Sequence, residues 1–249
     1  MESPLAVVIM AAGKGTRMKN PAVAKVMYTI NGKPMVEYAV DLARQLGATR
    51  IIVIVGWQKE SVVEHLADKA REAVCIEQAP QLGTGHAVMQ AEQSLKGFDG
   101  DVLVLSGDVP MLSRMALTSL IDLHRKHNAA ATVLTAELPD PTGYGRILRN
   151  TDGSVRGIIE HKDATDDQQR IHEINSGIYV FNKTHLFTAL AHVKPSNKQN
   201  EYYLTDVFGY FKENGLPVHA IAASNPDEIM GINTPEQLEI ARTIMDQRS

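Results

Sequence analysis

The chain has 249 residues, of which 44% are hydrophobic and 22% charged, and its formal net charge is −4. This composition is typical of a folded globular protein with a sizeable core, and it excludes a disordered chain. The mild negative charge and the lack of a basic run argue against nucleic-acid binding. A single cysteine excludes internal disulfides and cysteine metal clusters. Without a long apolar run or a basic-then-apolar start, we expect a cytoplasmic protein with no membrane partner.

The first predicted element is a strand over residues 5–9, followed by a loop that contains two glycines. The apolar, β-branched run is typical of a strand buried on both faces. The loop, MAAGKGTR at 10–17, has small residues whose backbone N–H groups can surround a phosphate chain. Arg17 and Lys25 add positive charge nearby. We interpret this loop as a triphosphate-binding segment, the alternative being an ordinary strand-to-helix turn.

Two common phosphate-binding motifs do not match this loop. A P-loop has four residues between its glycines, whereas only Lys14 separates Gly13 from Gly15. The dinucleotide fingerprint needs a small residue where Met18 stands and an acidic residue where the chain has Gly-Trp at 56–57. An NAD-dependent oxidoreductase is therefore a disfavoured alternative for this kind of fold.

Strand and helix patterns then alternate along the chain. Apolar residues at helical spacing predict a helix over 35–46, which Gly47 can end. Further strands are predicted at 51–55, 74–76 and 101–105, with helices around 61–66 and after the polar loop 78–86. This alternation predicts an α/β fold with a mostly parallel sheet and helices on both faces.

Two loops after predicted strands carry candidate ligand groups. The amides and hydroxyls of loop 78–86 suit the edge of a nucleobase, the alternative being a helix start capped by Thr84. His86 is interpreted as a packing or capping residue. Asp108 follows a strand at the edge where open α/β sheets bind ligands, and Mg²⁺ accepts one or two carboxylates together with substrate phosphates. Asp108 is therefore a candidate magnesium ligand, the alternative being a Gly-Asp turn.

The second half of the chain has a different pattern. After a helix over 115–127 and a strand over 130–136, turn-rich residues 139–146 lead to short strands, which are typical of an antiparallel extension. These strands are predicted at about 155–159 and 178–181. A helix ending near 214, a strand over 218–222 and a helix through 245 complete the chain.

Three polar residues of this half are candidate ligands. Glu160 can accept hydrogen bonds from sugar hydroxyls and Asn175 can supply amide contacts, while the alternative for the charges around Glu160 is a solvated face. Thr234 is a good N-cap because Pro235 follows it at the first helical position. That helix start does not require Asn233, which is therefore a second candidate metal ligand.

Five motifs, in chain order, together resemble a known family: AAGKGTRM, QLGTGHA, DPTGYGR, EHKDAT and EYY, which begin at residues 11, 81, 140, 160 and 201. From residue 7 to about 238 the chain resembles sugar-1-phosphate nucleotidyltransferases, and most closely the uridyltransferase domain of bacterial N-acetylglucosamine-1-phosphate uridyltransferases. The resemblance implies a Rossmann-like, GT-A-like nucleotidyltransferase fold of three layers with a smaller sugar-binding lobe. It implies one domain over 1–249, with a nucleotide lobe (1–112), a sugar lobe (113–226) and a returning metal-ligand loop with the C-terminal helix (227–249).

The same resemblance implies a role for each candidate residue. The nucleotide would be held by the loop backbone at Met10, Ala11, Ala12 and Gly13, and its uracil by Gln78, Gly83 and Thr84. Mg²⁺ would be coordinated by Asp108 and Asn233. Arg17 and Lys25 would contact phosphates and stabilise the transferring group. The sugar would be held by Gly145, Glu160, Asn175 and, near its N-acetyl group, Tyr202.

The implied reaction joins UTP and N-acetylglucosamine-1-phosphate into UDP-N-acetylglucosamine and pyrophosphate. The sugar phosphate is already an anion at neutral pH, so its attack on the α-phosphorus needs no general base. It does need Mg²⁺ and cations, because two anions must come together. Two alternatives stay open: the same reaction on another sugar-1-phosphate or nucleotide, and a non-catalytic nucleotide-sugar sensor. The full set of cations and metal ligands argues against the sensor.

The chain departs from the family pattern in three ways. Val23 and Ala24 precede Lys25 where the family usually has Leu-Pro, and one extra residue lies between Met18 and Lys25. Ser106 stands where close relatives tend to carry tyrosine. The sequence contains no hexapeptide repeats of the left-handed β-helix domain that usually follows, so we expect no acetyltransferase activity and, in any homo-oligomer, no β-helix trimer contact.

Overall fold

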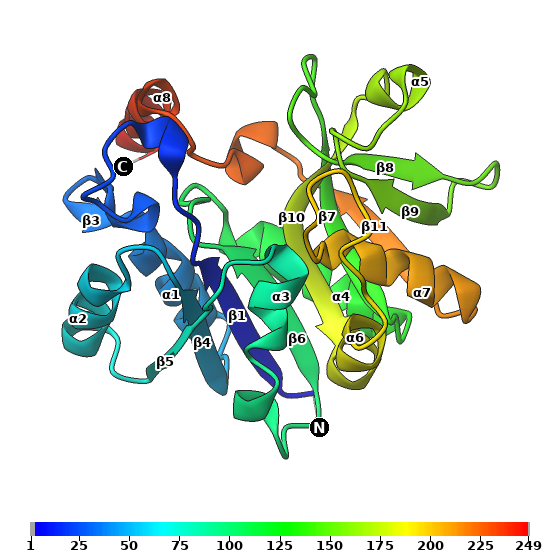
Figure 1. Cartoon of the computed structure of the whole chain (residues 1–249), viewed down its shortest axis with the longest axis horizontal. Helices are drawn as coiled ribbons and strands as arrows, with labels where there is room; N and C mark the ends of the chain where they lie inside the picture. Colours follow the sequence, from blue (N-terminus) through cyan, green and yellow to red (C-terminus); the bar gives the residue numbers. More distant parts are fainter. Residues whose placement is uncertain (1–2, 249) are drawn as a thin grey trace.

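The computed structural model describes residues 3–248, and its centre is a nine-stranded sheet (Figure 1). The strands are β1 (Leu5–Ala11), β4 (Arg50–Val55), β5 (Ala73–Glu77), β6 (Asp101–Ser106), β7 (Ala131–Glu137), β8 (Arg146–Arg149), β9 (Val155–Ile159), β10 (Glu173–Asn182) and β11 (Val218–Ala222). Seven of them follow the order β11-β7-β10-β6-β1-β4-β5, while β8 pairs with β10 and β9. The short strands β2 (Thr29–Ile30) and β3 (Lys33–Pro34) form a separate ribbon.

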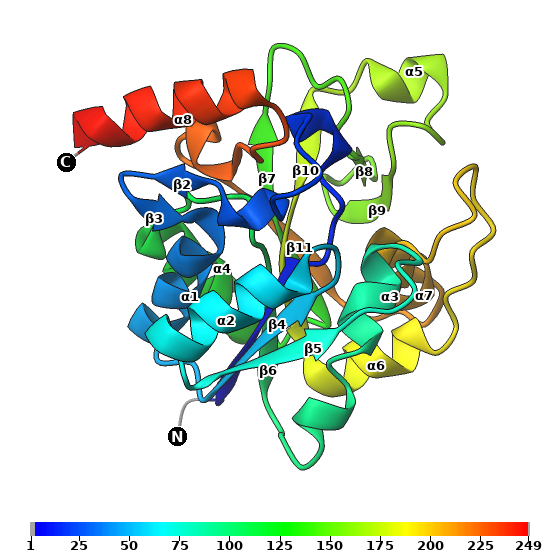
Figure 2. The ribbon, with the colours of Figure 1, turned by 60° about the vertical axis from the view of Figure 1, so that its left-hand side comes forward.

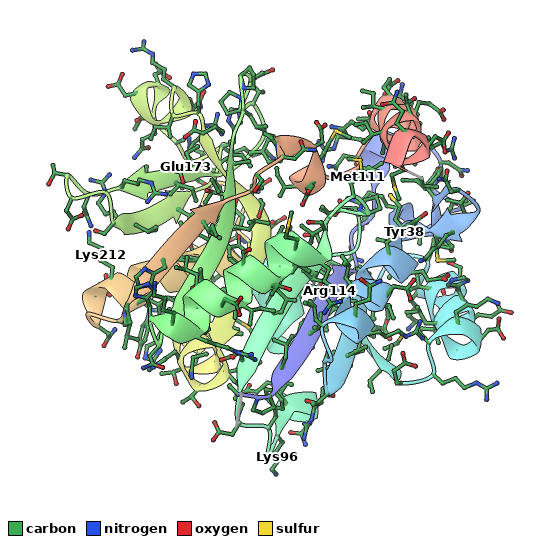
Figure 3. The ribbon with its side chains drawn as sticks, turned by 180° about the vertical axis from the view of Figure 1, so that it is seen from behind. Tyr38, Lys96, Met111, Arg114, Glu173 and Lys212 are labelled. Atoms are coloured by element: carbon green, nitrogen blue, oxygen red, sulfur yellow. The ribbon has the colours of Figure 1, made fainter. Side chains whose placement is uncertain are left out.

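The helices cover both faces of this sheet. They are α1 (Met35–Gln45), α2 (Lys59–Lys69), α3 (Thr84–Met89), α4 (Arg114–Lys126), α5 (Asp166–Gln169), α6 (Lys183–Leu190), α7 (Val207–Glu213) and α8 (Pro235–Arg248). Figure 1 shows α3, α6 and α7 in front of the sheet, and Figure 3, seen from behind, shows α4 on the opposite face.

The side chains of β1 explain the three layers, because successive residues of a strand point to opposite faces. Val7 and Ile9 are buried in a cluster with apolar residues of α1, α2 and α4. Ala6 and Val8 are buried in a second cluster with residues of α3, α6 and α7. Both faces of the strand are therefore buried from solvent, as its uninterrupted apolar sequence indicates. The predicted three-layer α/β fold is confirmed.

Strand direction brings the candidate loops to one edge of the sheet. β1 is parallel to β4 and β6, and Met10 lies opposite both Ile54 and Ser106. The loops that follow these three strands therefore meet at their common carboxyl end. Along the seven-strand path, β10 is antiparallel to both its neighbours, β6 and β7, and the other pairs are parallel. The mostly parallel sheet with an antiparallel extension is thus as predicted.

A third apolar cluster brings the C-terminal helix to the same edge. Ile232, Leu238 and Ala241 pack with Met18, which follows the glycine loop, and with Met111. In Figure 2, α8 (red) lies at the same end of the sheet as the dark-blue segment that follows β1. Figure 3 labels two residues of this region, Met111 of the cluster and Tyr38, which packs against it. Residues far apart in the sequence thereby become neighbours of the loop after β1.

The second half contains elements that the sequence pattern did not reveal. β8, α5 and α6 were not predicted, and β10 begins at Glu173 rather than at about 178. The polar residues at its start are tolerated inside the sheet because Ser176 Oγ donates a hydrogen bond to the Leu134 carbonyl at 2.6 Å, and because the pairing with β7 shifts register between Asn175 and Tyr179. The division into lobes at 112 and 226 stays a prediction, and the sheet is continuous across it. Among residues 3–248, no helix combines the length and apolar character needed to cross a bilayer.

Candidate active site

A cavity of about 870 Å³ opens at the carboxyl ends of β1, β4 and β6. Its lining includes every residue predicted to bind the nucleotide: Met10, Ala11, Ala12, Gly13, Gln78, Gly83 and Thr84. Lys25 and Asp108 also line it. The structure therefore brings the two predicted loops and two of the predicted charged residues to one opening.

One wall of the cavity depends on a close approach at Gly56. A Cβ at this position would lie 2.5 Å from Gln81 Nε2 and 2.7 Å from the Ala12 carbonyl oxygen, so only glycine fits without a shift. That carbonyl accepts hydrogen bonds from Gln81 Nε2 at 2.6 Å and from the Trp57 backbone N–H at 3.2 Å. Sequence reasoning did not select Gln81 or Trp57 as site residues. Gln81 stands in the QLGTGHA motif, which was the available signal.

The second wall, the loop before α3, is held by residues 202–204. Gly83 has φ +111°, and a Cβ there would lie 2.6 Å from the Tyr202 carbonyl oxygen. The same oxygen accepts a hydrogen bond from the Gly85 N–H at 2.7 Å. Thr84 does not cap α3: its hydroxyl accepts from the Leu204 N–H at 3.0 Å, and α3 begins after Gly83 without a side-chain cap. The loop therefore has a defined shape that backbone contacts maintain.

Gln78 is buried beneath this loop and links it to His86. Gln78 Nε2 donates to the Gly83 carbonyl at 2.9 Å and lies 3.2 Å from His86 Nδ1. Burial lowers the pKa of His86, which favours the neutral ring at neutral pH. His86 thus has the packing role expected of it, and its ring faces that of Tyr202 at 6.2 Å between centroids.

The four charged and amide residues predicted to act on the phosphates and metal meet beside the cavity. Asn233 Oδ1 accepts hydrogen bonds from Arg17 Nη2 at 2.9 Å and from Lys25 Nζ at 3.0 Å. Lys25 also forms an ion pair with Asp108 Oδ2. The Asp108 carbonyl accepts from the Ile232 N–H at 2.9 Å, which fixes the loop of Asn233 to the end of β6. We call Arg17, Lys25, Asp108 and Asn233 the cation–carboxylate cluster.

The extra residue before Lys25 does not keep it from this cluster. A Cβ at Gly15, whose φ is +59°, would lie 2.6 Å from the Cβ of Lys25. Glycine is therefore needed for the lysine to approach the loop. Tyr144 also lies near the cluster and was not predicted. Burial and the charge of Asp108 raise its pKa, while a hydrogen bond with the Gly231 backbone and the charge of Arg17 partly offset the rise.

Three of the four predicted sugar ligands form a separate group near β8 and β10. A Cβ at Gly145 would lie 3.4 Å from both Asn175 Cβ and Glu160 Oε2, and the Gly145 carbonyl accepts from the Asn175 N–H at 2.9 Å. Glu160 Oε1 accepts from the Thr205 hydroxyl at 2.9 Å. The fourth residue, Tyr202, lies against the loop before α3, where its backbone N–H donates to the Leu82 carbonyl at 2.8 Å.

Carboxylates gather around this group. Burial raises the pKa of Glu160, the Thr205 hydroxyl lowers it in part, and the charge of Asp163 raises it further. Burial, together with the charges of Glu160 and Asp163, raises the pKa of Asp206 to about 6. The group is thus acidic, in contrast to the cation–carboxylate cluster.

Comparison with known proteins identifies a family and relatives that the chain's sequence matches. The nucleotidyl transferase family matches residues 6–226. The bifunctional protein GlmU of Enterococcus faecalis is 46% identical over 241 residues, which cover 97% of this chain and 52% of that protein. GlmU of Geobacter metallireducens is 46% identical over 244 residues, which cover 98% and 51%. The chain therefore spans about half the length of the curated relatives it matches.

Solved structures agree on the fold. UDP-glucose pyrophosphorylase complexed with UDP-glucose superposes with a TM-score of 0.77 at 19% identity, covering 99% of this chain and 100% of that one. At this identity the likeness concerns the architecture of the sheet and helices. The expected nucleotidyltransferase fold is confirmed.

Proposed function

Because the chain belongs to the nucleotidyl transferase family, we propose that it transfers a uridylyl group from UTP to N-acetylglucosamine-1-phosphate, forming UDP-N-acetylglucosamine and pyrophosphate. The observation that most directly supports this is the cation–carboxylate cluster beside a cavity of about 870 Å³. The 46% identity to bifunctional GlmU proteins supports the choice of substrates within the family.

The reaction is an in-line displacement. A phosphate oxygen of the sugar phosphate attacks the α-phosphorus of UTP, the new P–O bond forms, and the bond to the β-phosphate breaks as pyrophosphate leaves. The nucleophile is already ionised at neutral pH, so no side chain has to remove a proton. Positioning and electrostatic stabilisation then account for most of the rate.

Arg17 and Lys25 supply that stabilisation in the proposal. Both are held through Asn233 Oδ1, and Lys25 also through Asp108, so their charges are directed to one point at the edge of the cavity. Cations fixed in advance need little rearrangement when negative charge increases on the equatorial oxygens of the α-phosphorus. They also reduce the repulsion between the two anionic substrates.

The donor atoms of the cluster fit Mg²⁺. Asp108 offers a carboxylate and Asn233 an amide oxygen, which are hard ligands of the kind that Mg²⁺ prefers. In this structure Asp108 Oδ2 and Asn233 Oδ1 accept from Lys25 and Arg17, so these side chains would have to release the two oxygens for the ion to bind. Within residues 3–248, no group of three or more His, Cys, Asp or Glu is arranged to hold a metal. That suits an ion held by two protein oxygens together with substrate phosphates, and when bound it would neutralise phosphate charge and orient the α-phosphate.

In the proposal, two further groups of residues select the substrates: one binds the base of the nucleotide and the other binds the sugar. Gln78, Gly83 and Thr84 line the cavity and would read uracil through amide, backbone and hydroxyl groups. Gly145, Glu160 and Asn175 would hold the sugar, with the carboxylate accepting hydrogen bonds from hydroxyls. Tyr202 would act mainly on the base side, since it lies against the loop before α3.

The test is pyrophosphate release with Mg²⁺ and each of four nucleoside triphosphates, over a panel of sugar-1-phosphates. We expect the fastest release with UTP and N-acetylglucosamine-1-phosphate, its loss in Asp108→Ala, and no change in Asp99→Asn, a matched exposed aspartate just before β6. Preference for another pair would retain the reaction and reassign the substrate. No release with any pair, despite measurable UTP binding, would contradict the proposal and favour a nucleotide-sugar sensor.

A further inference from the structure

A third cation at the cavity, Lys14, differs from the two in the cation–carboxylate cluster. Lys14 stands between the two glycines of the loop after β1 and lines the cavity. Within the described part of the chain it forms no ion pair, and its Nζ lies over the Trp57 ring, 5.7 Å from the centroid. Lys25, by comparison, is paired with Asp108. The charge of Lys14 is therefore available to an incoming anion.

Trp57 ties the two ends of this loop together. Its backbone N–H donates to the Ala12 carbonyl at 3.2 Å, at the start of the loop. Its indole Nε1 donates to the Pro21 carbonyl at 3.1 Å, which also accepts from Gln58 Nε2 at 3.1 Å. The side chain is 36% exposed and lines the cavity. Trp57 thus fixes the loop while presenting its ring face to Lys14.

We propose that Lys14 is a further phosphate-binding residue, which binds the phosphates of a nucleoside triphosphate beyond the α-phosphate, and that Trp57 is the residue that positions it. The inference rests on the proposed function only in that the nucleotide enters this cavity. Lys25 and Arg17 are already gathered at Asp108 and Asn233, where the α-phosphate would react. The remaining phosphates then extend along the glycine loop, where Lys14 is the cation that lies outside the cation–carboxylate cluster.

Lys14 can readily exchange its contact with the Trp57 ring for a contact with phosphate. An ammonium group over an exposed ring is held weakly, whereas a charge-assisted hydrogen bond to phosphate is stronger. The ring therefore keeps Lys14 at the edge of the cavity until a polyphosphate arrives. A nucleoside monophosphate lacks the groups that Lys14 would bind, so Lys14 should distinguish UTP from UMP.

Calorimetric binding of UTP and UMP tests the role of Lys14. We expect Lys14→Met to weaken UTP about 10-fold and UMP less than about 2-fold, because one charged phosphate contact is lost. Lys14→Arg should restore most of the UTP affinity. Lys19→Met, at an exposed lysine of the same segment that does not line the cavity, should bind both as the unmodified protein does. Equal weakening of UTP and UMP, or no weakening of either, would overturn the assignment.

Trp57 is the only tryptophan of the chain, so its fluorescence reports the contact directly. We expect UTP to change its emission more than UMP does, and Lys14→Met to remove that difference. An equal response to UTP and UMP in the unmodified protein would contradict the exchange. Trp57→Leu, which keeps the backbone bond to Ala12 but loses the indole bond to Pro21, should lower the UTP-over-UMP preference about 3-fold. An unchanged preference would contradict the positioning role.

The outcomes separate this inference from the proposed function. If no sugar-1-phosphate supports pyrophosphate release, but Lys14→Met still weakens UTP selectively, the transfer reaction fails and the phosphate site stands. If transfer occurs, the forward KM for UTP should rise in Lys14→Met while the KM for the sugar phosphate stays constant. Transfer with both KM values unchanged would overturn the role of Lys14 alone.

Discussion

The two halves of the candidate site carry opposite charge. On the proposed nucleotide side, Lys14, Arg17 and Lys25 lie at or beside the cavity, where Asp108 is paired with Lys25 and Glu77 and Glu201 also belong to the lining. On the sugar side, burial and mutual repulsion raise the pKa of Glu160. Polyphosphates need cations, whereas the neutral hydroxyls of a sugar need acceptors. The two charge patterns are those that the two proposed substrates would need.

The contrast also predicts different kinetic effects. Cations directed at the reacting phosphorus bind most strongly when charge increases there, so their loss should lower kcat. Acceptors for sugar hydroxyls contact groups that do not change during the reaction, so their loss should mainly raise KM. Variants in the two halves can therefore confirm or break the comparison.

The largest effect is expected on the nucleotide side. Arg17→Ala should lower kcat about 1,000-fold, a loss of about 4 kcal/mol of transition-state stabilisation, because a directed cation disappears. Arg17→Lys should lose less, since it keeps the charge but not the guanidinium bond to Asn233. Steady-state pyrophosphate release measures both. A change confined to KM would break the proposed division between the two halves.

A stability effect is expected from Gly83→Ala. The new Cβ would meet the Tyr202 carbonyl oxygen at 2.6 Å, and φ +111° is unfavourable for alanine. We expect a loss of about 3 kcal/mol of unfolding free energy, measured by denaturant titration. Gly153→Ala is the matched control, because Gly153 also has positive φ (+84°) but no atom within 4 Å of the added Cβ. Equal losses in both variants would assign the effect to φ alone rather than to the contact with Tyr202.

On the proposed sugar side, the charge of Glu160 should make the KM for the sugar phosphate depend on pH. Burial raises the pKa of Glu160 above its usual value, so its accepting, ionised form is complete above that raised pKa and lost as the pH falls through it. Glu160→Gln should raise the KM for the sugar phosphate about 10-fold at neutral pH. The ratio of the two KM values should approach one in acid.

Comparing the variant with the unmodified protein at each pH cancels the titration of the sugar phosphate itself. Glu213→Gln, on the exposed surface of α7, serves as the matched control and should leave KM unchanged. A KM ratio that does not vary with pH would show that the charge of Glu160 is not what the sugar contacts.

The smallest effect is expected from Gly145→Ala. The added Cβ would lie 3.4 Å or more from its neighbours, which is ordinary van der Waals contact, and the backbone there does not require glycine. The protein should fold with an unfolding free energy within about 1 kcal/mol of the original. The methyl group would narrow the space beside Glu160 and Asn175, raising the KM for the sugar phosphate about 3-fold. An unchanged KM would place the sugar elsewhere.

The parallel part of the fold could be predicted well from local sequence. Residues 5–9 and 51–55 are continuous apolar runs, and such runs have few uses except as strands buried on both faces. Asp108 was recognisable because it directly follows such a strand. The helix start at Thr234 was also readable: Thr234 Oγ1 accepts from the Gln237 N–H at 3.2 Å, as a cap should.

The antiparallel part was harder because its polar side chains are buried or used as caps through hydrogen bonds that no apolar pattern reveals. Arg146 begins β8 and is 1% exposed, although an arginine in a turn-rich stretch suggests a solvated loop. Its guanidinium donates to the Tyr144 and Gln169 carbonyls, while its Nε is buried without a hydrogen-bond partner among the described residues. Likewise, α6 is capped by Asn182, whose Oδ1 accepts from the Thr184 and His185 N–H groups. Neither arrangement has a periodic apolar signal.

By itself, the sequence determined the glycine loop, the buried strands and the residue types that can bind phosphate and metal, because these depend on neighbours a few positions away. Tertiary structure alone decided which of them meet. Arg17 and Asn233 are 216 positions apart, and they are joined because α8 packs on Met18 and Met111. It also placed Tyr202 against the loop before α3 and Lys14 over Trp57. Such contacts depend on how the layers pack, and that packing is a property of the whole chain.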